Sequence, residues 1–447
     1  MQIEIKELGF IKNVKVDLDK NLTILCGPNN SGKTYLSYFI YGLYKYRSDI
    51  KTLNSLNKIL EKGQIEFDLY ELVSENDFEL LKLHCINYTN QIHKVFAAEN
   101  KNFSKTEINL SIKNKDYLLS RIKNRTIEAG LGIGGKSILK LIKDTNSTIL
   151  NCIIIEKEKG DENDDIPQII ISSFIDNFIN KIVLDLIFNN VFIAPSERVA
   201  INIFSKELSL KRTVLVDKLL ELKENKKEDD PFDLISRRAT RYPLPIRDML
   251  EISEDLSNYK KNISQFNDFA DEIEKDIIKG QISISSDGDV QFQPDKAKSK
   301  KFPIHLTASS VKSLSNLIIY FRHLAKPNDF IIIDEPELNL HPDNQVLIAR
   351  IIAKIVNKGF KVLISTHSDY IVREINNLIT LKSKPELAEE LKYSNDELLN
   401  YKDVAAILFH YEKRKTENLK VNETGFEVET IDKVINELNE RSQRIYF

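Results

Sequence analysis

The chain has 447 residues, 42% of them hydrophobic, and its 64 basic and 67 acidic residues give a net charge of −3. This length and apolar content predict two or three domains, or one large domain with insertions. The near-neutral charge excludes a general electrostatic attraction to nucleic acid but not a local basic patch. Cys26, Cys85 and Cys152 lie in apolar runs without metal-ligand spacing, so we expect buried thiols in a reducing cytoplasm.

The first residues predict strands rather than a signal peptide. Residues 2–8 and 11–18 alternate between apolar and polar side chains, and residues 21–26 form an apolar, β-branched run. No apolar run approaches the roughly 20 residues that span a bilayer. From the strands we expect an antiparallel β-layer that leads into a parallel core. From the lack of a signal peptide and of a spanning segment we expect a cytoplasmic protein with no membrane partner.

A glycine-rich loop follows at residues 27–34, which read GPNNSGKT and fit the pattern G-x-x-x-x-G-K-[ST]. A predicted strand precedes the loop, and an apolar helix predicted over 33–46 follows it. In this arrangement the backbone N–H groups of the loop and the helix N-terminus face a bound phosphate group. Lys33 then neutralises the β- and γ-phosphates, and Thr34 ligates Mg²⁺. The residues predicted to bind ATP in this loop are Asn29, Asn30, Ser31, Gly32, Lys33, Thr34 and Tyr35.

The next part of the chain is less regular. Alternation predicts meander strands at 64–70, 102–113 and 146–156. Residues 157–166 are highly charged, and we interpret them as a solvated loop, with an acidic metal site as the alternative. A long apolar helix is predicted over 167–189.

The strand predicted at 191–193 ends in Ala194-Pro195-Ser196-Glu197-Arg198. Charged residues just past a buried strand stand where α/β sheets bind ligands, but a surface turn with an ion pair fits equally well. Residues 200–278 are mostly helical and are interrupted by the charged run 223–230. The part after this run, residues 245–279, has apolar residues at helical spacing that predict one buried face, among them Met249, Leu256, Ile263 and Phe269. Ordinary packed helices are favoured there over a projecting hairpin, since no heptad pattern is sustained.

A β-hairpin is predicted within residues 280–306, with a turn at Ser286-Asp287-Gly288. Its second half carries a basic cluster made of Lys296, Lys298, Lys300 and Lys301. A solvated loop is one interpretation of this cluster. Contact with nucleic acid, or with an acidic face of a partner, is the other.

Residues 330–333 form an apolar strand that ends in Asp334 and Glu335. Carboxylates are costly to bury there unless they meet a metal or a cation. We expect Asp334 to hold Mg²⁺ beside the glycine-rich loop 27–34 and Glu335 to polarise the attacking water. A further strand at 361–365 leads to His367, which is predicted to contact the γ-phosphate or to orient that water.

An apolar helix is predicted from Ser309 or Ser310 to about Leu324. Either serine suits the N-cap position, since its side chain can accept a hydrogen bond from a free backbone N–H group. A helix N-terminus also receives phosphate, so both roles are compatible.

These motifs resemble the ABC-type ATPase head shared by SMC proteins, DNA-repair ATPases and the overcoming-lysogenization-defect nucleases. Residues 27–34 match Walker A, residues 331–335 match Walker B with its catalytic glutamate, and His367 matches the switch histidine. The region of 337–342 matches the D-loop, and residues 308–312 stand where the ABC signature belongs. The match is closest to bacterial AAA family ATPases, many of them from anti-phage defence systems such as PARIS and Septu.

This resemblance implies a homodimer or higher oligomer in which two heads enclose two ATP molecules and Ser309 acts on the partner's nucleotide. The usual signature has paired glycines after its serine, whereas Ser310 and Val311 stand here, and no glutamine loop can be placed. The related nucleases carry a metal-binding domain after the head. Residues 381–447 are too short for one and lack its carboxylate pattern, so a separate nuclease or toxin is expected as the effector.

We therefore predict an α/β fold, namely an ABC-ATPase-like head with a helical insertion. Its expected parts are an N-terminal lobe (1–199), the insertion (200–279), a C-terminal lobe (280–380) and a small α/β extension (381–447). The expected function is an ATP-driven dimer switch that controls a partner effector. A DNA-clamping ATPase of the repair type is the alternative, while a transporter ATPase is disfavoured because no coupling region is recognisable.

Overall fold

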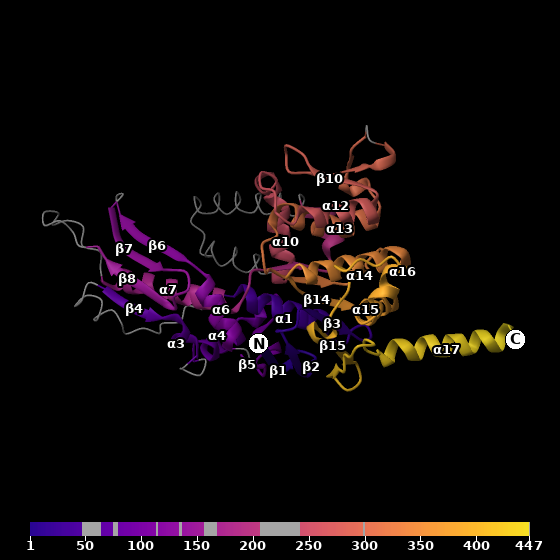
Figure 1. The fold of residues 1–447 in the computed structure, drawn as a ribbon, viewed down its shortest axis with the longest axis horizontal. Helices are drawn as coiled ribbons and strands as arrows, with labels where there is room; N and C mark the ends of the chain where they lie inside the picture. The colour runs from indigo at the N-terminus through magenta and orange to yellow at the C-terminus, as the bar shows by residue number, and fades with distance from the viewer. Residues whose placement is uncertain are drawn as a thin grey trace, which may run out of the picture. The chain divides into compact units, whose positions relative to one another are not determined.

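The computed structural model describes residues 1–46, 64–74, 79–112, 115–133, 136–155, 168–205, 242–297 and 300–446 (Figure 1). The chain divides into a larger compact unit of residues 4–43, 91–107 and 191–447, and a smaller one of 1–3, 44–90 and 108–190. The charged runs at 157–166 and 223–230, together with Lys298, lie outside the described residues.

A mixed β-sheet forms the centre of the larger unit. Its strands follow the spatial order β1 (Gln2–Leu8), β2 (Ile11–Asp17), β16 (Lys415–Leu419), β15 (Val404–His410), β3 (Leu22–Cys26), β14 (Lys361–Thr366), β13 (Phe330–Asp334), β9 (Val191–Ala194). The last five run parallel to one another, and β16 is antiparallel to β15. Parallel strands are covered on both faces, so β3, β13 and β9 are buried along their whole length. The predicted α/β fold class is therefore confirmed.

Two strands of this sheet come from the end of the chain. β15 pairs in parallel with β3 along Val404–Leu408, and so lies directly beside the strand that leads into the glycine-rich loop. β16 continues the sheet towards β2 through a bridge between Lys415 and Asn13. Strands of the segment predicted as a C-terminal extension thus belong to the central sheet, while the four domain boundaries stay a prediction.

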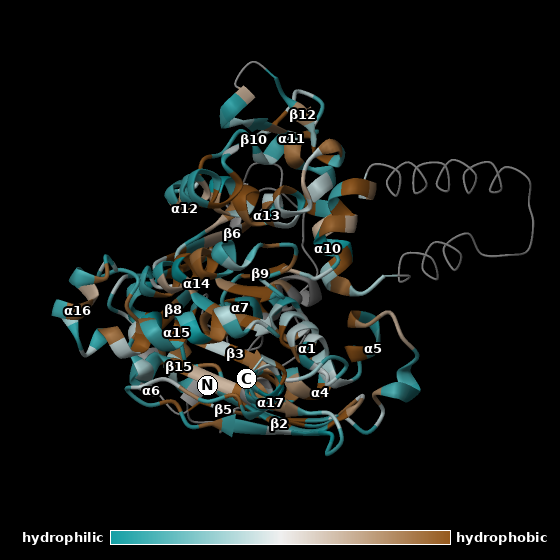
Figure 2. Ribbon diagram, turned by 90° about the vertical axis from the view of Figure 1, so that its right-hand side faces the viewer, coloured by the Kyte–Doolittle hydropathy of each residue, from teal (hydrophilic) through white to brown (hydrophobic). Residues whose placement is uncertain are grey.

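Helices and a hairpin complete the larger unit. The helices are α1 (Lys33–Lys45), α5 (Ile92–Val95), α10 (Leu244–Glu254), α11 (Leu256–Tyr259), α12 (Asn267–Ile273), α13 (Ser309–Ile319), α14 (Pro342–Asn357), α15 (Asp369–Lys382), α16 (Pro385–Glu390), α17 (Glu429–Tyr446). The predicted hairpin is present as β10 (Gly280–Ile284), β11 (Val290–Pro294), β12 (Phe302–Pro303). Helices α12, α13 and α14 pack together on one apolar core, and β9 and much of α13 are coloured as hydrophobic in Figure 2.

The described residues after 241 form short packed helices, with one correction to the predicted apolar face. Met249, Leu256 and Phe269 are buried as the helical spacing predicts. Ile263, assigned to the same face, is 78% exposed. The chain leaves helical geometry between α11 and α12, where the Ser264 N–H group donates to the carbonyl of Arg322, so the periodicity no longer determines which side chains point inward.

A buried ion pair links the end of α13 to the turn before β10. Arg322 donates to both carboxylate oxygens of Glu274, at 2.7 and 3.0 Å, and to the carbonyl of Ile282 at 3.1 Å. The side chain of Glu274 is 7% exposed and that of Arg322 is 18% exposed. The Glu274 carboxylate also accepts from the backbone N–H of Ile282, so the pair fixes the start of the hairpin.

Replacing Arg322 by methionine is expected to lower the free energy of unfolding by about 3 kcal/mol, because Glu274 keeps a buried charge without its cation. Thermal or urea unfolding measures this loss. The matched control is Arg441→Met, whose ion pair with Glu437 is exposed, and its change should stay within about 0.5 kcal/mol. Equal changes in the free energy of unfolding of the two variants would show that the buried Arg322–Glu274 pair stabilises the protein no more than an exposed pair does.

The smaller unit contains an antiparallel sheet in the order β4-β8-β7-β6. Its elements are β4 (Gln64–Asp68), α3 (Leu69–Ser74), α4 (Glu79–Thr89), β5 (Glu107–Ser111), α6 (Lys115–Asn124), β6 (Ile127–Ile133), β7 (Lys136–Lys143), β8 (Ile149–Ile154), α7 (Gln168–Ile187). The strands predicted in this region correspond to β4, β5 and β8, and the predicted long helix corresponds to α7. Among the described residues, none of the helices combines the length and the apolar character needed to cross a membrane.

Candidate nucleotide-binding site

The carboxyl ends of four neighbouring parallel strands lie at one edge of the sheet. Cys26 at the end of β3 pairs with Thr366 of β14, and Asp334 at the end of β13 pairs with Ser365. The end of β9 lies on the other side of β13, where Ala194 pairs with Ile333. Ligands of open α/β sheets bind at such an edge, so the predicted site residues on three of these strands come together as their order required.

Close packing explains the two glycines of the loop 27–34. Gly27 has φ +137°, and a Cβ atom there would lie 2.6 Å from the carbonyl oxygen of Phe409 on β15. Gly32 has φ +105°, and its Cβ would lie 2.7 Å from the side chain of Ile11. Any other residue would push the loop away from these neighbours. The glycines therefore let the backbone lie flat against β2 and β15 ahead of α1.

Lys33 is held inside the loop that precedes it. The residue is 5% exposed, and its Nζ donates to the carbonyls of Gly27 at 2.9 Å and Pro28 at 2.8 Å. Its Nζ also lies 3.4 Å from His367 Nδ1. Burial lowers the pKa of Lys33 to about 8, although Asp334 and Glu335 act in the opposite direction. A cation bonded to the carbonyls of its own loop in this way is available to an anion that enters the loop.

The other loop residues predicted to bind nucleotide line its surface. Asn29 and Asn30 are exposed, and Asn30 adopts a left-handed backbone with φ 57°. Ser31 donates from Oγ to the carbonyl of Pro28 at 2.8 Å and so closes the turn. The ring of Tyr35 is 42% exposed and stacks on that of Phe96, with 4.9 Å between centroids. Both asparagines and Tyr35 are thus accessible to a ligand, whereas Ser31 stabilises the loop.

Thr34 and Asp334 form the candidate metal site. Thr34 Oγ1 donates to Asp334 Oδ2 at 3.0 Å, and the Ser365 hydroxyl donates to Asp334 Oδ1. Asp334 is fully buried, and burial raises the pKa of its carboxyl while the two hydroxyl donors lower it. No described residue supplies a hydrogen-bonded cation to this carboxylate, so an oxygen-binding cation fits. Mg²⁺ is commonly held by one carboxylate together with substrate phosphates, and the threonine and aspartate oxygens meet that requirement.

Glu335 and His367 are paired beside this site. His367 Nε2 lies 3.4 Å from Glu335 Oε1, and the two side chains are 30% and 32% exposed. The contact with His367 lowers the pKa of the Glu335 carboxyl, which keeps it ionised and able to accept a proton. The Glu335 backbone has φ 51°, and its N–H group donates to Ser365 O at 3.0 Å. Ser365 of β14 therefore holds the strained backbone of Glu335 in place.

Two residues at the site had no predicted role, although Glu337 belongs to the region matched to the D-loop. Glu337 accepts hydrogen bonds from the His367 N–H at 2.7 Å and the Thr366 hydroxyl at 2.9 Å, and burial raises the pKa of its carboxyl. Ser365 binds both Asp334 and the N–H of Glu335. The sequence contains a signal for Glu337, since it is an acidic residue two positions past the Asp-Glu pair. Nothing in the pattern of an apolar strand distinguishes Ser365.

The predicted N-cap at Ser309 or Ser310 is wrong. Ala308 occupies the N-cap position of α13, and no side chain caps the helix, because both serines already lie within its first turn. Among the described residues, no hydrogen bond joins either serine to the loop 27–34. Val311 is 3% exposed and packs into the core beneath the helix. Its side chain therefore leaves the surface at the start of α13 free.

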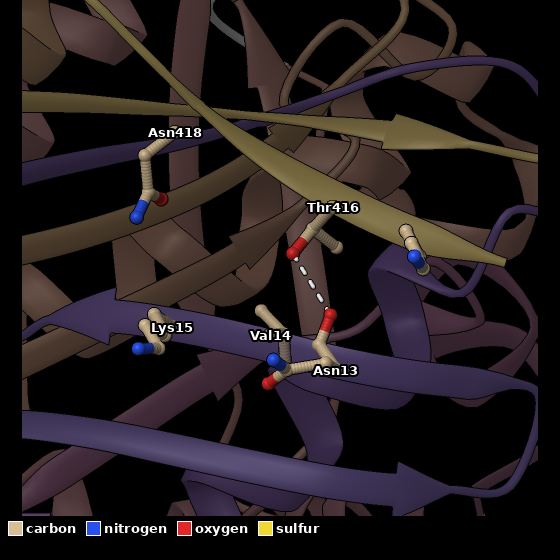
Figure 3. Close-up of a pocket in the computed structure, with 6 residues that line it drawn as sticks. Asn13, Val14, Lys15, Thr416 and Asn418 are labelled. Carbon is tan, nitrogen blue, oxygen red and sulfur yellow. Dashed lines mark hydrogen bonds between the residues drawn. The ribbon is translucent and has the colours of Figure 1, made fainter. Parts of the chain in front are cut away.

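A separate pocket lies where β2 meets β16 (Figure 3). Thr416 Oγ1 donates to the carbonyl of Asn13 at 3.1 Å and joins the two strands across it. The lining consists of Asn13, Val14, Lys15, Lys415, Thr416 and Asn418. None of the residues predicted to bind nucleotide lines this pocket, so it is distinct from the candidate site.

Comparison with known proteins gives a family and two structural similarities. A family model described as an AAA ATPase domain matches residues 1–372. The chain is similar to the Pyrococcus furiosus Smc head domain with an extended coiled coil, bound to the C-terminal domain of ScpA (13% identity, 98% of each chain, TM-score 0.33). It is also similar to the SmcHead bound to the C-winged helix domain of ScpA (12% identity, 94% of this chain, 96% of that chain, TM-score 0.35). No curated protein sequence matches the chain.

Proposed function

The chain belongs to the AAA ATPase domain family, and from this premise we propose that it binds ATP with Mg²⁺ and hydrolyses it. One observation carries the proposal. A single edge of the sheet brings together a buried lysine in a glycine loop, a buried aspartate facing a threonine hydroxyl, and an ionised glutamate paired with a histidine. Phosphoryl transfer to water needs these parts, namely a phosphate cradle, a metal holder and a proton acceptor.

Each side chain has a defined task in this proposal. Lys33 leaves the carbonyls of its own loop and pairs with the β- and γ-phosphate oxygens. Thr34 and Asp334 would hold Mg²⁺, which supplies charge neutralisation on those oxygens. Glu335 orients the attacking water and accepts its proton, and His367 keeps that carboxylate ionised and in place. Glu337 fixes the backbone from which His367 projects.

Metal removal tests the proposal directly. Phosphate release from ATP is expected with Mg²⁺ and should fall at least ~100-fold in excess EDTA, because the γ-phosphate charge is then neutralised by Lys33 alone. Adding back Mg²⁺ after EDTA is the control. Turnover that is indifferent to the metal would refute the role given to Thr34 and Asp334, and the absence of any turnover would refute the hydrolase proposal.

Hydrolysis is proposed to drive a homodimer switch that controls a separate effector, in anti-phage defence. Ser309 starts α13 at an exposed helix N-terminus, and Val311 is turned into the core, so a second copy can approach this surface with its nucleotide. Such a switch requires that ATP binds the closed dimer better than the open one. The motif set of the chain, with its resemblance to defence-system ATPases, supports this biological setting.

A DNA-clamping ATPase is the second candidate. Lys296, Lys300 and Lys301 are all exposed in the segment after β11, which gives this hairpin a local positive charge. Such a cluster contacts phosphates in a salt-dependent manner. The candidate predicts that duplex DNA accelerates ATP turnover several-fold at low salt and that the acceleration disappears when the three lysines are replaced by glutamine. Unchanged turnover with DNA would leave the effector switch as the better proposal.

A further inference from the structure

The buried side chain of Arg198 connects three separate parts of the larger unit. Arg198 follows β9 in the turn that the sequence left open between a ligand site and a surface ion pair. It is 2% exposed and is among the largest fully buried side chains of the described residues. The surface ion pair is wrong, because the guanidinium points into the protein rather than towards solvent. A ligand site at this turn stays a prediction.

The guanidinium binds only oxygen atoms of neutral groups. Nη1 donates to the Asp334 carbonyl at 2.6 Å and Nη2 to the Glu335 carbonyl at 2.6 Å. Nε donates to the carbonyl of Ser313 on α13 at 3.0 Å and to its hydroxyl at 3.2 Å. Nη1 also reaches the Pro195 carbonyl at 3.0 Å. The planar fork of arginine is the side chain that can satisfy so many fixed acceptors at once.

This arrangement keeps a charge where burial disfavours it. Burial lowers the pKa of Arg198 to about 10, although several acidic side chains act to raise it. An apolar residue of similar volume would avoid that penalty, but it would leave the carbonyls of Asp334 and Glu335 without these donors. The need to hold these two peptide groups in place therefore explains why a cation is buried here among neutral partners.

The two peptide groups belong to Asp334 and Glu335, the residues proposed above to hold Mg²⁺ and to accept the proton of water. Glu335 has a left-handed backbone, which a glutamate adopts only when its surroundings enforce it. Its N–H group is bound by Ser365 on β14 and its carbonyl by Arg198, so both sides of the strained residue are fixed. The carboxylate that faces His367 therefore projects from a backbone that these two contacts hold.

Helix α13 is attached to the same turn by a second side chain. Asn202, one helical turn after Arg198, donates to the Lys312 carbonyl at 2.7 Å and to the Ser315 hydroxyl at 2.8 Å. Within the described part of the chain no hydrogen bond joins Asn202 to β13, whereas Arg198 is hydrogen-bonded to both α13 and β13. A displacement of α13 therefore reaches Glu335 through Arg198 and not through Asn202.

We propose that Arg198 is a positioning residue that couples the place of α13 to the orientation of the Glu335 carboxylate. The inference rests on the proposed hydrolysis by Glu335 and names how that site is regulated. When a second copy engages the exposed start of α13, the helix shift is passed through the Arg198 fork to the end of β13. The buried guanidinium is bonded to protein carbonyls and a hydroxyl, so Arg198 acts on kcat and not on the affinity for ATP.

The test compares Arg198→Met and Arg198→Lys with Asn202→Ala, in the full chain. Because a misplacement of about 1 Å at a reacting group lowers rates by up to ~100-fold, we expect kcat to fall at least ~10-fold in both Arg198 variants. The Kd of a fluorescent ATP analogue should stay within about threefold of wild type. Asn202→Ala removes a second contact with α13 but leaves the Arg198 bonds to Ser313, Asp334 and Glu335 in place, so it should keep kcat within about threefold.

Each result bears on the inference. Unchanged kcat in Arg198→Lys overturns it even if Arg198→Met fails to fold, since lysine cannot supply the fork. An equal fall in Asn202→Ala also overturns it, because the loss then comes from the packing of α13. Absence of turnover in wild type is a failure of the proposed function. Wild-type turnover that Glu335→Gln abolishes and Arg198→Lys leaves intact is a failure of this inference alone.

Discussion

Replacing Glu335 by glutamine is expected to lower kcat for ATP hydrolysis by at least ~100-fold while leaving ATP binding intact. Glutamine has the same shape and can keep the 3.4 Å contact with His367, but it cannot accept a proton from water. General-base catalysis contributes about 10²- to 10⁴-fold to such reactions. The measurement is phosphate release alongside the binding of a fluorescent ATP analogue, so that a loss of chemistry is distinguished from a loss of affinity.

The same variant reports on the proposed dimer switch. ATP that is bound but not hydrolysed should hold two heads together, so the solution mass of Glu335→Gln should double with ATP and Mg²⁺ and return to the monomer value after their removal. Glu412→Gln, at an exposed position in the turn after β15, is the matched control and should behave as wild type. Turnover that Glu335→Gln leaves unchanged would eliminate Glu335 as the proton acceptor, and a constant mass would eliminate the dimer switch.

The sequence predicted the central part of the site because each motif stands at the end of an apolar run. Parallel strands place their carboxyl ends at one sheet edge, so the loop 27–34, Asp334 and His367 had to converge once the strands were recognised. The contacts that the structure adds between them, such as Thr34 with Asp334 and Lys33 with His367, follow from that convergence. Local pattern was sufficient here because the chemistry is concentrated at strand ends.

What the sequence could not supply depends on contacts between distant segments. β15 lies beside β3 although their paired residues Val404 and Leu22 are 382 positions apart along the chain (404 − 22). Its sequence is that of any buried strand, and pattern alone does not state which neighbour it joins. Arg198 illustrates the same limit, since its partners on β13 and α13 are more than 100 positions away. The prediction of the N-cap of α13 was wrong for a local reason. Ser309 and Ser310 suit the N-cap position equally well by residue type, but the helix begins at Ser309 and Ala308 occupies that position.

Replacing Lys33 by alanine is expected to weaken ATP binding by at least ~100-fold. The lysine is the cation nearest the predicted phosphates, and each hydrogen bond between charged groups is worth about 1.5–3 kcal/mol. Alanine removes both the charge and the anchor on the carbonyls of Gly27 and Pro28, to which Nζ donates in the free protein. Lys33→Arg is the matched variant, since it keeps the charge but is too large for this buried position.

Isothermal titration with a slowly hydrolysed ATP analogue and Mg²⁺ measures the loss for both variants. Weak binding of the ATP analogue by Lys33→Arg would show that a positive charge alone is not sufficient, and that the compact ammonium group at its position in the loop is needed. Unfolding measured in parallel separates binding from stability, because Lys33 is bonded to its own loop before any ligand arrives. If Lys33→Ala binds ATP as tightly as wild type, the loop 27–34 is not the phosphate cradle, and the candidate site must be abandoned as a whole.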